Sequence, residues 1–475
     1  MEFSQSIRFL MVRILATWTV AMATFSGATE CRQTEQIGLR RLIGDYESPT
    51  GCRAHVADLT DFGGVGDGVT SNTKAFRDAV GNLSMYSDDG GAMLLVPPGR
   101  WLTGPFNLTS HFTLFLHSDA VILASTDLDE YPIVDPLPSY GRGRDIPGGR
   151  YSNFIWGSNL TDVIVTGDNG TINGQGQIWW DKFHNKELNS TRGYLLELMY
   201  SEKIIISNLV FVNSSSWNLH PVYCNDVVIS GVTILAPTTS PNTDGIDPDS
   251  CSNVRIEDSF VVSGDDCIAI KSGWDQYGIR VGIPSEHILI RRFTCISPYS
   301  AVIALGSEMS GGISDVRAED IVAIHSESAV RIKTGVGRGG YVRDVFVRGV
   351  TLHTMKYVFW ISGNYGSHPD DGWDPKALPE ISGINYSNFV AENVTMAANL
   401  EGIDSDVFSG ICISNVTISL SPKPKKVQWN CTYVEGSTYD VRPTPCALLP
   451  ENGAPCAFPT ETLPVESLQL DICSK

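Results

Sequence analysis

Basic residues are scarce in this sequence of 475 residues. Lysine and arginine together number 34, against 53 aspartates and glutamates, so the formal net charge is −19 at pH 7. A protein that binds nucleic acid needs clustered Lys and Arg to displace the counterions of the phosphates. The charge balance therefore argues against a nucleic-acid partner, and an anionic partner would need a local basic site.

The N-terminal apolar segment is too short for an ordinary membrane-spanning helix. After Arg13 it runs for only about a dozen residues, whereas a bilayer span needs roughly 20. Basic residues before it and Ser26, Gly27 and Ala28 after it predict a signal peptide at residues 1–28. We therefore expect a secreted protein of the extracellular space or cell wall, without stable membrane association. A membrane anchor retained in the secretory pathway is the alternative.

Two further features fit passage through the secretory pathway. All eleven cysteines follow the predicted signal, from Cys31 to Cys473, which suits an oxidising compartment; their odd number leaves at least one unpaired within the chain. The sequence also contains ten Asn-X-Ser/Thr glycosylation motifs. They begin at Asn82, Asn107, Asn159, Asn169, Asn189, Asn213, Asn385, Asn393, Asn415 and Asn430.

Helix-length segments are absent between a series of recurring β-type runs. Their starts are separated by about 23 to 34 residues before a longer interval, and each alternates apolar residues with polar ones before turning at a polar residue or glycine. Without helical crossovers, a Rossmann fold or α/β barrel does not fit. The runs start at Ile204, Val227, Val254, Ile288, Val316, Val345 and Ile411, with a degenerate copy at Ile384.

This repeat predicts an all-β fold, a right-handed parallel β-helix over residues 50–420. An antiparallel sandwich or propeller is the alternative, but its Asn-Gly or Asp-Gly hairpin turns are missing between the runs. Residues 421–475 are rich in proline and contain Cys431, Cys446, Cys456 and Cys473. We expect them to form a disulfide-pinned cap or tail, with the pairing left open.

A short helix is predicted near the start of the β-helix. A glycine-rich turn leads to Thr70, Ser71 or Asn72 as the N-cap, and an apolar stripe follows at Ala75, Phe76, Ala79 and Val80. Such a helix would cover the open end of the core. A phosphate-binding loop does not fit, because neither a Lys-Ser/Thr pair nor a full GxGxxG pattern is present.

Three aspartates in two short motifs form the candidate catalytic cluster. Asp244 lies in Asn-Thr-Asp-Gly, and Asp265 and Asp266 follow Gly264, about one repeat later. Neighbouring coils of a β-helix stack about 4.8 Å apart, so these side chains are expected side by side. Their mutual repulsion would raise the pKa of at least one. Glycoside hydrolysis needs this combination of one protonated and one ionised carboxyl.

A basic pair lies on a later repeat. Arg331 and Lys333 alternate with Ile332 and so point to the same face, where they could hold an anionic substrate. Taken singly, each motif is also typical of a turn or a solvated surface. A calcium site built from Asp244, Asp247, Asp249, Asp265 and Asp266 is the main rival. We expect no metal and no cofactor, because a cation would compete with the basic pair for the same face.

The ordered set of these motifs resembles the polygalacturonases, glycoside hydrolase family 28. The resemblance runs from about Leu59 to about Ser421, and the segment Gly306–Gly312 is similar to plant putative polygalacturonases and bacterial exo-acting relatives. It implies inverting, metal-independent hydrolysis of α-1,4-linked galacturonan. Asp265 would be the general acid, and Asp244 and Asp266 would activate water. Arg331, Lys333 and Tyr365 would bind the substrate, and Asn242 would orient or bind it and not transfer protons.

The sequence departs from the family at one motif. The family usually has Gly-His-Gly before its Gly-Ser, whereas residues 295–307 contain no histidine. Because that histidine is thought to tune the acid or bind substrate, its loss puts the rate, the pH optimum and the substrate in doubt. The resemblance also implies a disulfide between Cys267 and Cys295 beside the site.

Other functions remain open at this stage. They are hydrolysis of another pectic polymer such as xylogalacturonan or rhamnogalacturonan, pectin binding by a catalytically impaired site, and calcium-dependent pectate elimination. An insertion at residues 274–286 favours an exo-type barrier, but the catalytic residues do not decide between endo and exo action. We expect the protein to act as a monomer on an anionic polysaccharide.

Overall fold

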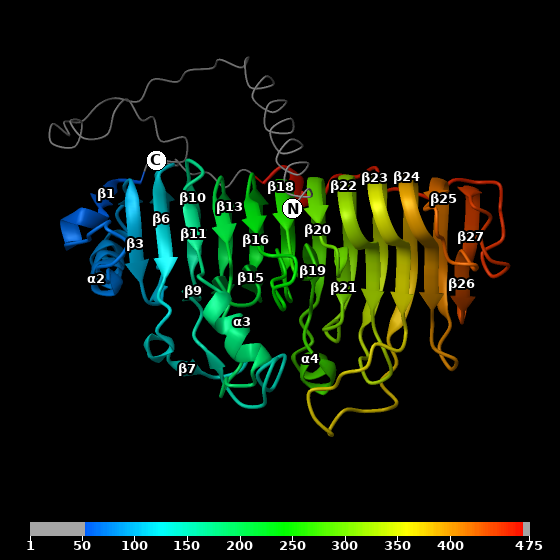
Figure 1. Cartoon of the computed structure of the whole chain (residues 1–475), viewed down its shortest axis with the longest axis horizontal. Helices are drawn as coiled ribbons and strands as arrows, with labels where there is room; N and C mark the ends of the chain where they lie inside the picture. The colour runs from blue at the N-terminus through cyan, green and yellow to red at the C-terminus, as the bar shows by residue number, and fades with distance from the viewer. Residues whose placement is uncertain (1–52, 469–475) are drawn as a thin grey trace, which may run out of the picture. The chain divides into compact units, whose positions relative to one another are not determined.

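The computed structural model describes residues 53–468, and its strands wind into a parallel β-helix (Figure 1). Twenty-one strands join one large sheet, and every strand pairing within it is parallel. The predicted right-handed parallel β-helix is thus confirmed, and the antiparallel alternative is wrong. The predicted signal peptide at residues 1–28 lies outside the described residues, as do Cys31, Cys52 and Cys473. No helix within residues 53–468 is long and apolar enough to cross a membrane.

Each coil of the β-helix contributes strands to up to three stacked ladders. The first ladder runs, in spatial order, through β1 (His55–Asp58), β2 (Ala92–Val96), β5 (Phe112–Leu116), β10 (Thr161–Gly167), β13 (Glu202–Ser207), β16 (Asn225–Ser230), β18 (Ser252–Val262), β20 (Ser285–Ile296), β22 (Ile313–Lys333), β23 (Tyr341–Ser362), β24 (Glu380–Glu401), β25 (Phe408–Leu420) and β27 (Val434–Arg442). The second runs through β3 (Gly99–Thr103), β6 (Ala120–Ala124), β11 (Thr171–Asn173), β14 (Val210–Val212) and β17 (Thr233–Leu235) into the later part of β18.

The third ladder bears the polar residues considered below. It consists of β4 (Phe106–Asn107), β9 (Ile155–Ser158), β12 (Leu196–Met199), β15 (Leu219–Val222), β19 (Ile268–Ile270), β21 (Ala301–Gly306) and β26 (Trp429–Thr432), together with the last residues of β22, β23 and β24. Single bridges at Ile246 and Asp249 join β15 to the coil of β19. Outside the ladders, β7 (Ile133–Val134) and β8 (Arg150–Tyr151) form an antiparallel pair.

The repeat found in the sequence corresponds to one register of the first ladder. The first residues of the repeats pair directly with one another on successive coils, and all are buried. The polar or glycine position four residues later has a positive φ in every repeat. Asn, Asp and Gly tolerate this left-handed conformation best, which explains the composition of the corner. These corner residues are Asn208, Gly231, Asp258, Arg292, Asp320, Gly349, Asn388 and Asn415.

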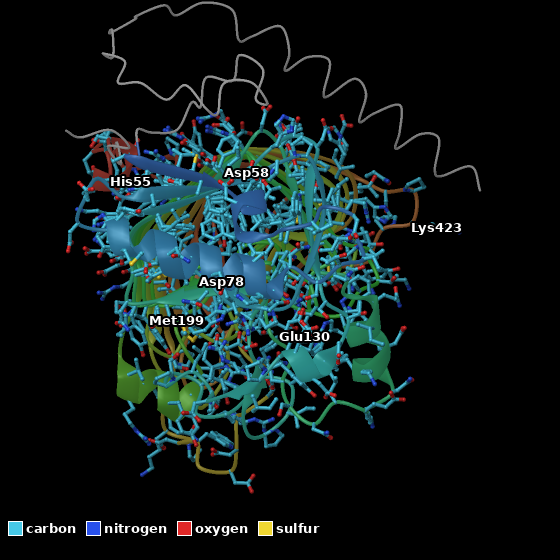
Figure 2. The ribbon with its side chains drawn as sticks, turned by 90° about the vertical axis from the view of Figure 1, so that its left-hand side faces the viewer. His55, Asp58, Asp78, Glu130, Met199 and Lys423 are labelled. Carbon is cyan, nitrogen blue, oxygen red and sulfur yellow. A yellow bond between two sulfur atoms is a disulfide. The ribbon has the colours of Figure 1, made fainter. Side chains whose placement is uncertain are left out.

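The predicted helix covers the first coil. It is α2 (Thr73–Leu83), and its stripe of Ala75, Phe76, Ala79 and Val80 is buried. Figure 2 looks onto this end of the coil, with Asp78 of α2 in front of the strands. Asn72 is the N-cap residue, but its side chain bonds back to Val65 of the glycine-rich turn and not to the helix.

The β-helix continues past the boundary expected at residue 420. Strands β26 and β27 pair in parallel with β24 and β25, so this expected boundary is too early. Disulfides Cys412–Cys456 and Cys431–Cys446 tie the following segment to these last coils. The chain then returns along the outside, where Arg255 donates to the carbonyl oxygen of Val465. The residues after 442 thus form a pinned tail.

Short helices complete the described residues. Two α-helices interrupt the coils, α3 (Gln177–His184) and α4 (Asp275–Val281), and neither was predicted. The 3-10 turns are η2 (Leu59–Phe62), η3 (Ser84–Tyr86), η4 (Leu128–Glu130) and η5 (Pro464–Glu466).

The stacked core predicts a contrast between inward and outward positions. Ile290 is fully buried and pairs with Ile256 and Ala318 on the adjacent coils, whereas Val390 is 55% exposed. We expect Ile290→Ala to lower the free energy of unfolding by about 2–5 kcal/mol through lost burial and a cavity. Val390→Ala, the matched control, should change it by less than about 0.5 kcal/mol. Denaturant unfolding measures both, and equal effects would contradict the assigned orientation.

Candidate active site

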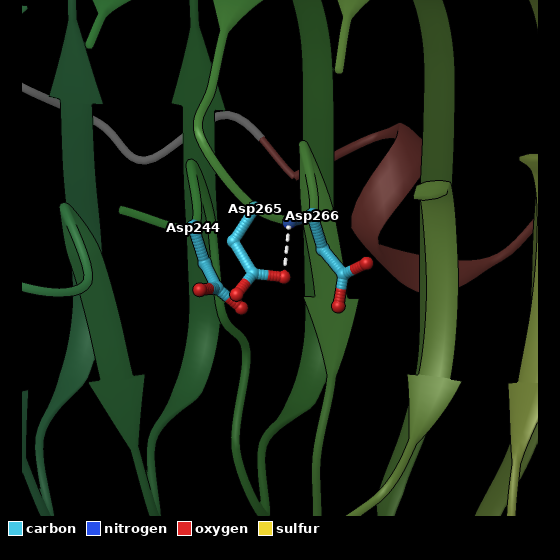
Figure 3. A group of neighbouring side chains, drawn as sticks. All are labelled: Asp244, Asp265 and Asp266. Atoms are coloured by element: carbon cyan, nitrogen blue, oxygen red, sulfur yellow. Dashed lines mark hydrogen bonds between the residues drawn. The ribbon is translucent and has the colours of Figure 1, made fainter. Parts of the chain in front are cut away.

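The three aspartates lie side by side on two neighbouring coils, just before the residues with which each coil joins the third ladder (Figure 3). Asp244 precedes Ile246, which bridges to Ile268 of β19, and Asp265 and Asp266 precede β19 itself. One oxygen from each carboxyl lies within 4.8 Å of the others. The sequence-based expectation that residues 21 positions apart would meet across the stack is therefore confirmed.

Gly245 makes this close stacking possible. Its backbone N–H donates to the carbonyl oxygen of Asp266 on the next coil. A Cβ at this position would lie 2.4 Å from the carbonyl oxygen of Cys267, which is too close for any side chain. The glycine that follows Asp244 is therefore a packing requirement of the coil.

Asp266 is held in its ionised form. Burial opposes its charge, but Lys333 Nζ and Ser300 Oγ each donate to its carboxylate at 2.5 Å, and the backbone N–H of Ala301 donates at 3.0 Å. Together these groups lower the pKa of Asp266 below its ordinary value. Asp266 is thus suited to act as a base and poorly suited to donate a proton.

Asp244 and Asp265 have the opposite character. Burial and then the neighbouring charge of Asp265 raise the pKa of Asp244 well above its ordinary value. Burial and then Asp266 also raise the pKa of Asp265. Because the two groups interact, they behave as a pair that retains a proton next to the ionised Asp266. Asp244 is only 3% exposed, whereas Asp265 is partly exposed and so more accessible to a ligand.

Lys271 is a central residue that the sequence interpretation missed. Its ammonium nitrogen lies 3.7 Å from Asp244, 3.6 Å from Asp247 and 3.5 Å from Glu308, and 4.3 Å from the ring centroid of Trp217. These carboxylates raise the pKa of Lys271 well above its ordinary value despite its burial. A lysine that ends the otherwise apolar run from Cys267 was the signal available in the sequence.

Glu308 and Arg144 extend this charge network toward the surface. Arg144 Nε donates to Glu308 Oε1 at 2.7 Å, and its guanidinium lies 4.4 Å from the ring centroid of Trp274. Burial disfavours the charge of Glu308, but Arg144 and Lys271 outweigh it and lower the pKa of Glu308. The network therefore links a surface loop to the carboxylate cluster.

Asn242 is engaged within the protein. Its Nδ2 donates to Asp265 Oδ2 at 3.3 Å, and its Oδ1 accepts from Arg192 Nη2 at 2.7 Å. The geometry fits an orienting role at Asp265, one of the two roles that the resemblance implies for Asn242.

Arg331, Lys333 and Tyr365 lie together but face two pockets. Arg331 lies 3.4 Å from the ring centroid of Trp360 and 5.5 Å from that of Tyr365. Lys333 lines the pocket of the aspartates and Arg331 lines its neighbour. The two cations therefore have different surroundings, because Lys333 is already paired with Asp266.

The aspartates line a pocket of about 270 Å³. A second pocket of about 400 Å³, which contains Trp360, Asn399 and Glu401, shares Arg144 and Tyr365 with the first. Three cationic side chains also line the first pocket, and each is paired with a carboxylate of the protein. They are Arg144, Lys271 and Lys333.

The residues around the three aspartates fit ion pairing with lysines better than they fit calcium binding. The three aspartates are close enough together to hold a cation. However, the ammonium groups of Lys333 and Lys271 already lie against Asp266 and Asp244. Asp249 instead accepts hydrogen bonds from Tyr140, His220 and Ser250. Two lysines beside the proposed ligands leave little reason for a divalent cation to bind there.

Serines occupy the segment in which the family histidine is missing. Ser300 Oγ donates to the Asp266 carboxylate, as described above, and Ser297 Oγ donates to the backbone carbonyl of Asp265 at 2.5 Å. The adjacent disulfide Cys267–Cys295 is present, as the resemblance implied. Cys224 and Cys251, by contrast, are free and buried.

A buried layer of charge lies behind the pocket. His220 contacts Glu197 at 2.8 Å and Asp249 at 3.3 Å, and its ring packs edge-on against Tyr194 and Trp217. Burial lowers the pKa of His220, but the two carboxylates outweigh it and raise the pKa to about 9. Arg150 and His220 likewise lower the pKa of Glu197 to about 2 against the effect of burial. This layer supports the two aromatic side chains that line the pocket.

Comparisons with known proteins agree with this geometry. The family model described as "Glycosyl hydrolases family 28" matches residues 144–444. A probable polygalacturonase from Vitis vinifera is 62% identical over 98% of this chain and 94% of its own length. The exopolygalacturonase of Thermotoga maritima has a similar crystal structure, with a TM-score of 0.69 and 27% identity over 85% of this chain and 93% of its own.

A further solved structure supports the fold alone. The endo-xylogalacturonan hydrolase of Aspergillus tubingensis has a TM-score of 0.61 and 22% identity, and the match covers 85% of this chain and 98% of that chain.

The buried histidine predicts a pH-dependent stability. Its pKa is higher in the folded protein, about 9, than the ordinary value of 6.5, so the imidazolium stabilises the fold fully below pH 6.5. This stabilisation is lost as the pH rises through about 9. We expect up to about 3 kcal/mol to be lost over this range, at about 1.4 kcal/mol for each pKa unit. His220→Gln should be less stable at pH 6 and lack this loss.

Unfolding midpoints measured from pH 6 to pH 10 test this expectation. His184→Gln, a substitution of an exposed histidine on α3, serves as the matched control and should keep the wild-type profile. Parallel pH profiles for the wild type and His220→Gln would show that His220 is not charged in the fold.

Proposed function

The chain belongs to glycosyl hydrolases family 28 and is a glycoside hydrolase, and we propose that it hydrolyses α-1,4-glycosidic bonds of galacturonan in pectin. The single observation that carries the proposal is the carboxylate cluster, in which a proton-retaining pair lies against an ionised aspartate. The names of the similar proteins support the same substrate class. Arg331 lines the second pocket, where its guanidinium can meet the carboxylates of a galacturonan chain.

We assign the general acid to Asp265. It is the most accessible member of the proton-retaining pair, so it can reach the oxygen of the scissile bond. Its carboxylic acid donates the proton to that oxygen as the bond to the anomeric carbon breaks. Asn242 and the backbone N–H of Asp266 fix its two oxygens.

We assign the base to Asp266 together with Asp244. Asp266 is ionised beside Lys333 and can accept a proton from the attacking water. Once the shared proton resides on Asp265, Asp244 is ionised as well, and Lys271 at 3.7 Å compensates its charge. The two ammonium groups therefore allow two carboxylates to be ionised next to the acid.

We propose that the reaction inverts the anomeric configuration. This part rests on the family resemblance and not on the carboxylate spacing. One oxygen of each carboxyl lies within 4.8 Å of the others. Inverting enzymes usually separate the acid and the base by about 6.5–9.5 Å, and retaining enzymes by about 5–5.5 Å. The short spacing makes the configuration of the product an informative measurement.

The same site suits other pectic polymers, and xylogalacturonan or rhamnogalacturonan remain alternatives for the substrate. The missing histidine suggested a further alternative, a pectin-binding protein with a catalytically impaired site. The contacts from Ser300 and Lys333 to Asp266 favour catalysis, because they keep a base ionised, a role separate from that of the missing histidine. Elimination by a calcium-dependent lyase is not supported, because two lysines lie against the aspartates that would hold the calcium ion.

We also propose that the enzyme is secreted to the cell wall and acts as a monomer. The three disulfides within residues 53–468 and the ten glycosylation motifs support secretion. A retained membrane anchor at residues 1–28 is the alternative.

The assignment of the acid predicts a large loss in one variant. We expect Asp265→Asn to lower the rate of reducing-end release from polygalacturonate by about 10²- to 10⁴-fold, because the proton donor is removed. Asp371→Asn, an exposed substitution away from the pocket, is the control and should retain wild-type activity. The catalytic assignment would be wrong if Asp265→Asn kept full activity, or if the purified wild type released no sugar from any pectic polymer.

The stereochemical proposal predicts the first product. An inverting enzyme acting on an α-linked chain releases the β-anomer, which then mutarotates. Proton NMR spectra of digests in the first minutes should therefore show β-anomeric signals ahead of α-anomeric ones. Early appearance of the α-anomer would instead indicate retention and a covalent intermediate, in accordance with the short carboxylate spacing.

A further inference from the structure

Side chains from three segments form a wall of the pocket of the catalytic aspartates, on the side of the earlier coils. Asp145 from the segment between β7 and β8, Phe183 from the end of α3, and Thr191 before β12 all line this side. None of these residues was singled out in the sequence. The wall faces the aspartates across the same pocket of about 270 Å³, so it bounds the space available to a substrate.

Arg192 holds the wall together. Its side chain is fully buried, and Nε and Nη2 donate to the two oxygens of Asp145 at 2.9 and 3.1 Å. Its Nη1 donates to the carbonyl oxygen of Pro241 at 2.9 Å, and Nη2 also donates to Asn242. The ring centroid of Phe183 lies 3.9 Å from its guanidinium. One side chain thus joins the loop, the helix and the residue that positions the proposed acid.

The helix and the loop behind the wall are themselves anchored. Trp180 of α3 is buried, and its Nε1 donates to the carbonyl oxygen of Ser214 at 3.0 Å. The backbone N–H groups of Asp145 and Ile146 donate to Thr191 Oγ1 at 3.0 and 3.1 Å. Buried side chains and hydrogen bonds thus attach the wall to the coils behind it.

On the side of the later coils, the site leads into another cavity. The second pocket continues from Arg144 and Tyr365 to Arg331 and Trp360. A polymer therefore has room on one side of the aspartates and a barrier on the other.

We infer that the enzyme cuts at chain ends and releases one or two sugar units at a time. The inference rests on the proposed function. The walled pocket of about 270 Å³ is smaller than the roughly 300–1,000 Å³ of ordinary small-molecule sites, so it admits only a short piece of a chain. The rest of the polymer extends into the second pocket, where Arg331 and Trp360 line its path.

Hydrolysis of hexagalacturonate by the wild-type protein tests the inference directly. We expect the first products to be the monomer with the pentamer, or the dimer with the tetramer, while the trimer stays a minor product. With polygalacturonate, the viscosity should fall slowly relative to the release of reducing ends. A predominance of trimer, together with a rapid early fall in viscosity, would overturn the inference but leave the proposed hydrolysis intact.

A variant of the wall provides a second test. Phe183→Ala shortens the wall, and we expect it to raise the ratio of trimer to the shorter products by about tenfold, a change of about 1.4 kcal/mol in relative barrier. Asp181→Ala, at an exposed position of the same helix that does not line the pocket, is the matched control and should keep the wild-type pattern.

The outcomes separate the two proposals. An unchanged product ratio in Phe183→Ala would show that the wall does not set the cleavage position. Release of no product from hexagalacturonate or any pectic polymer would contradict the proposed function, and the inference with it.

Discussion

The close stacking of coils in the β-helix is the constraint on which the site depends. It brings oxygens of Asp244, Asp265 and Asp266 within 4.8 Å of one another in a largely buried place, where three ionised carboxylates would repel strongly. Two ammonium groups and one retained proton relieve this repulsion. Lys333 pairs with Asp266, Lys271 lies among Asp244 and its acidic neighbours, and the proton stays with the pair that includes Asp265. The proposed acid and base functions therefore follow from the geometry of the fold.

The same fold lets distant segments complete the site. The ladders carry the aspartates and lysines on rigid strands, whereas the barrier comes from α3 and the segment before β8, which interrupt the coils. Different segments of the chain thus provide the reacting carboxylates and limit the space for the substrate. Substitutions in the ladders should change the rate and its pH dependence, and substitutions in the wall should change which bond of the polymer is cut. Arg192 connects the two, because it contacts both Asp145 of the wall and Asn242 beside Asp265.

The sequence predicted those features that a local repeat determines. The runs from Ile204 to Ile411 gave the parallel β-helix and its register, and their polar corners match residues with positive φ. The repeat also placed Asp244 beside Asp265. The partners Lys271, Glu308 and Arg192 were missed because their roles depend on side chains that meet across several coils and an inserted loop. The boundary at residue 420 was too early because the loop before β26 interrupts the repeat pattern of the last coil.

The site works as proposed only if one proton is shared within the cluster while Asp266 stays ionised. Carbon-13 NMR of the aspartate carboxyl groups, assigned by comparison with single Asp→Asn variants, measures this most directly. We expect the Asp266 resonance to remain that of a carboxylate below the ordinary aspartate pKa of 3.8, and a resonance from Asp244 or Asp265 to titrate well above it. Three aspartates that all titrate near pH 4 would contradict the account.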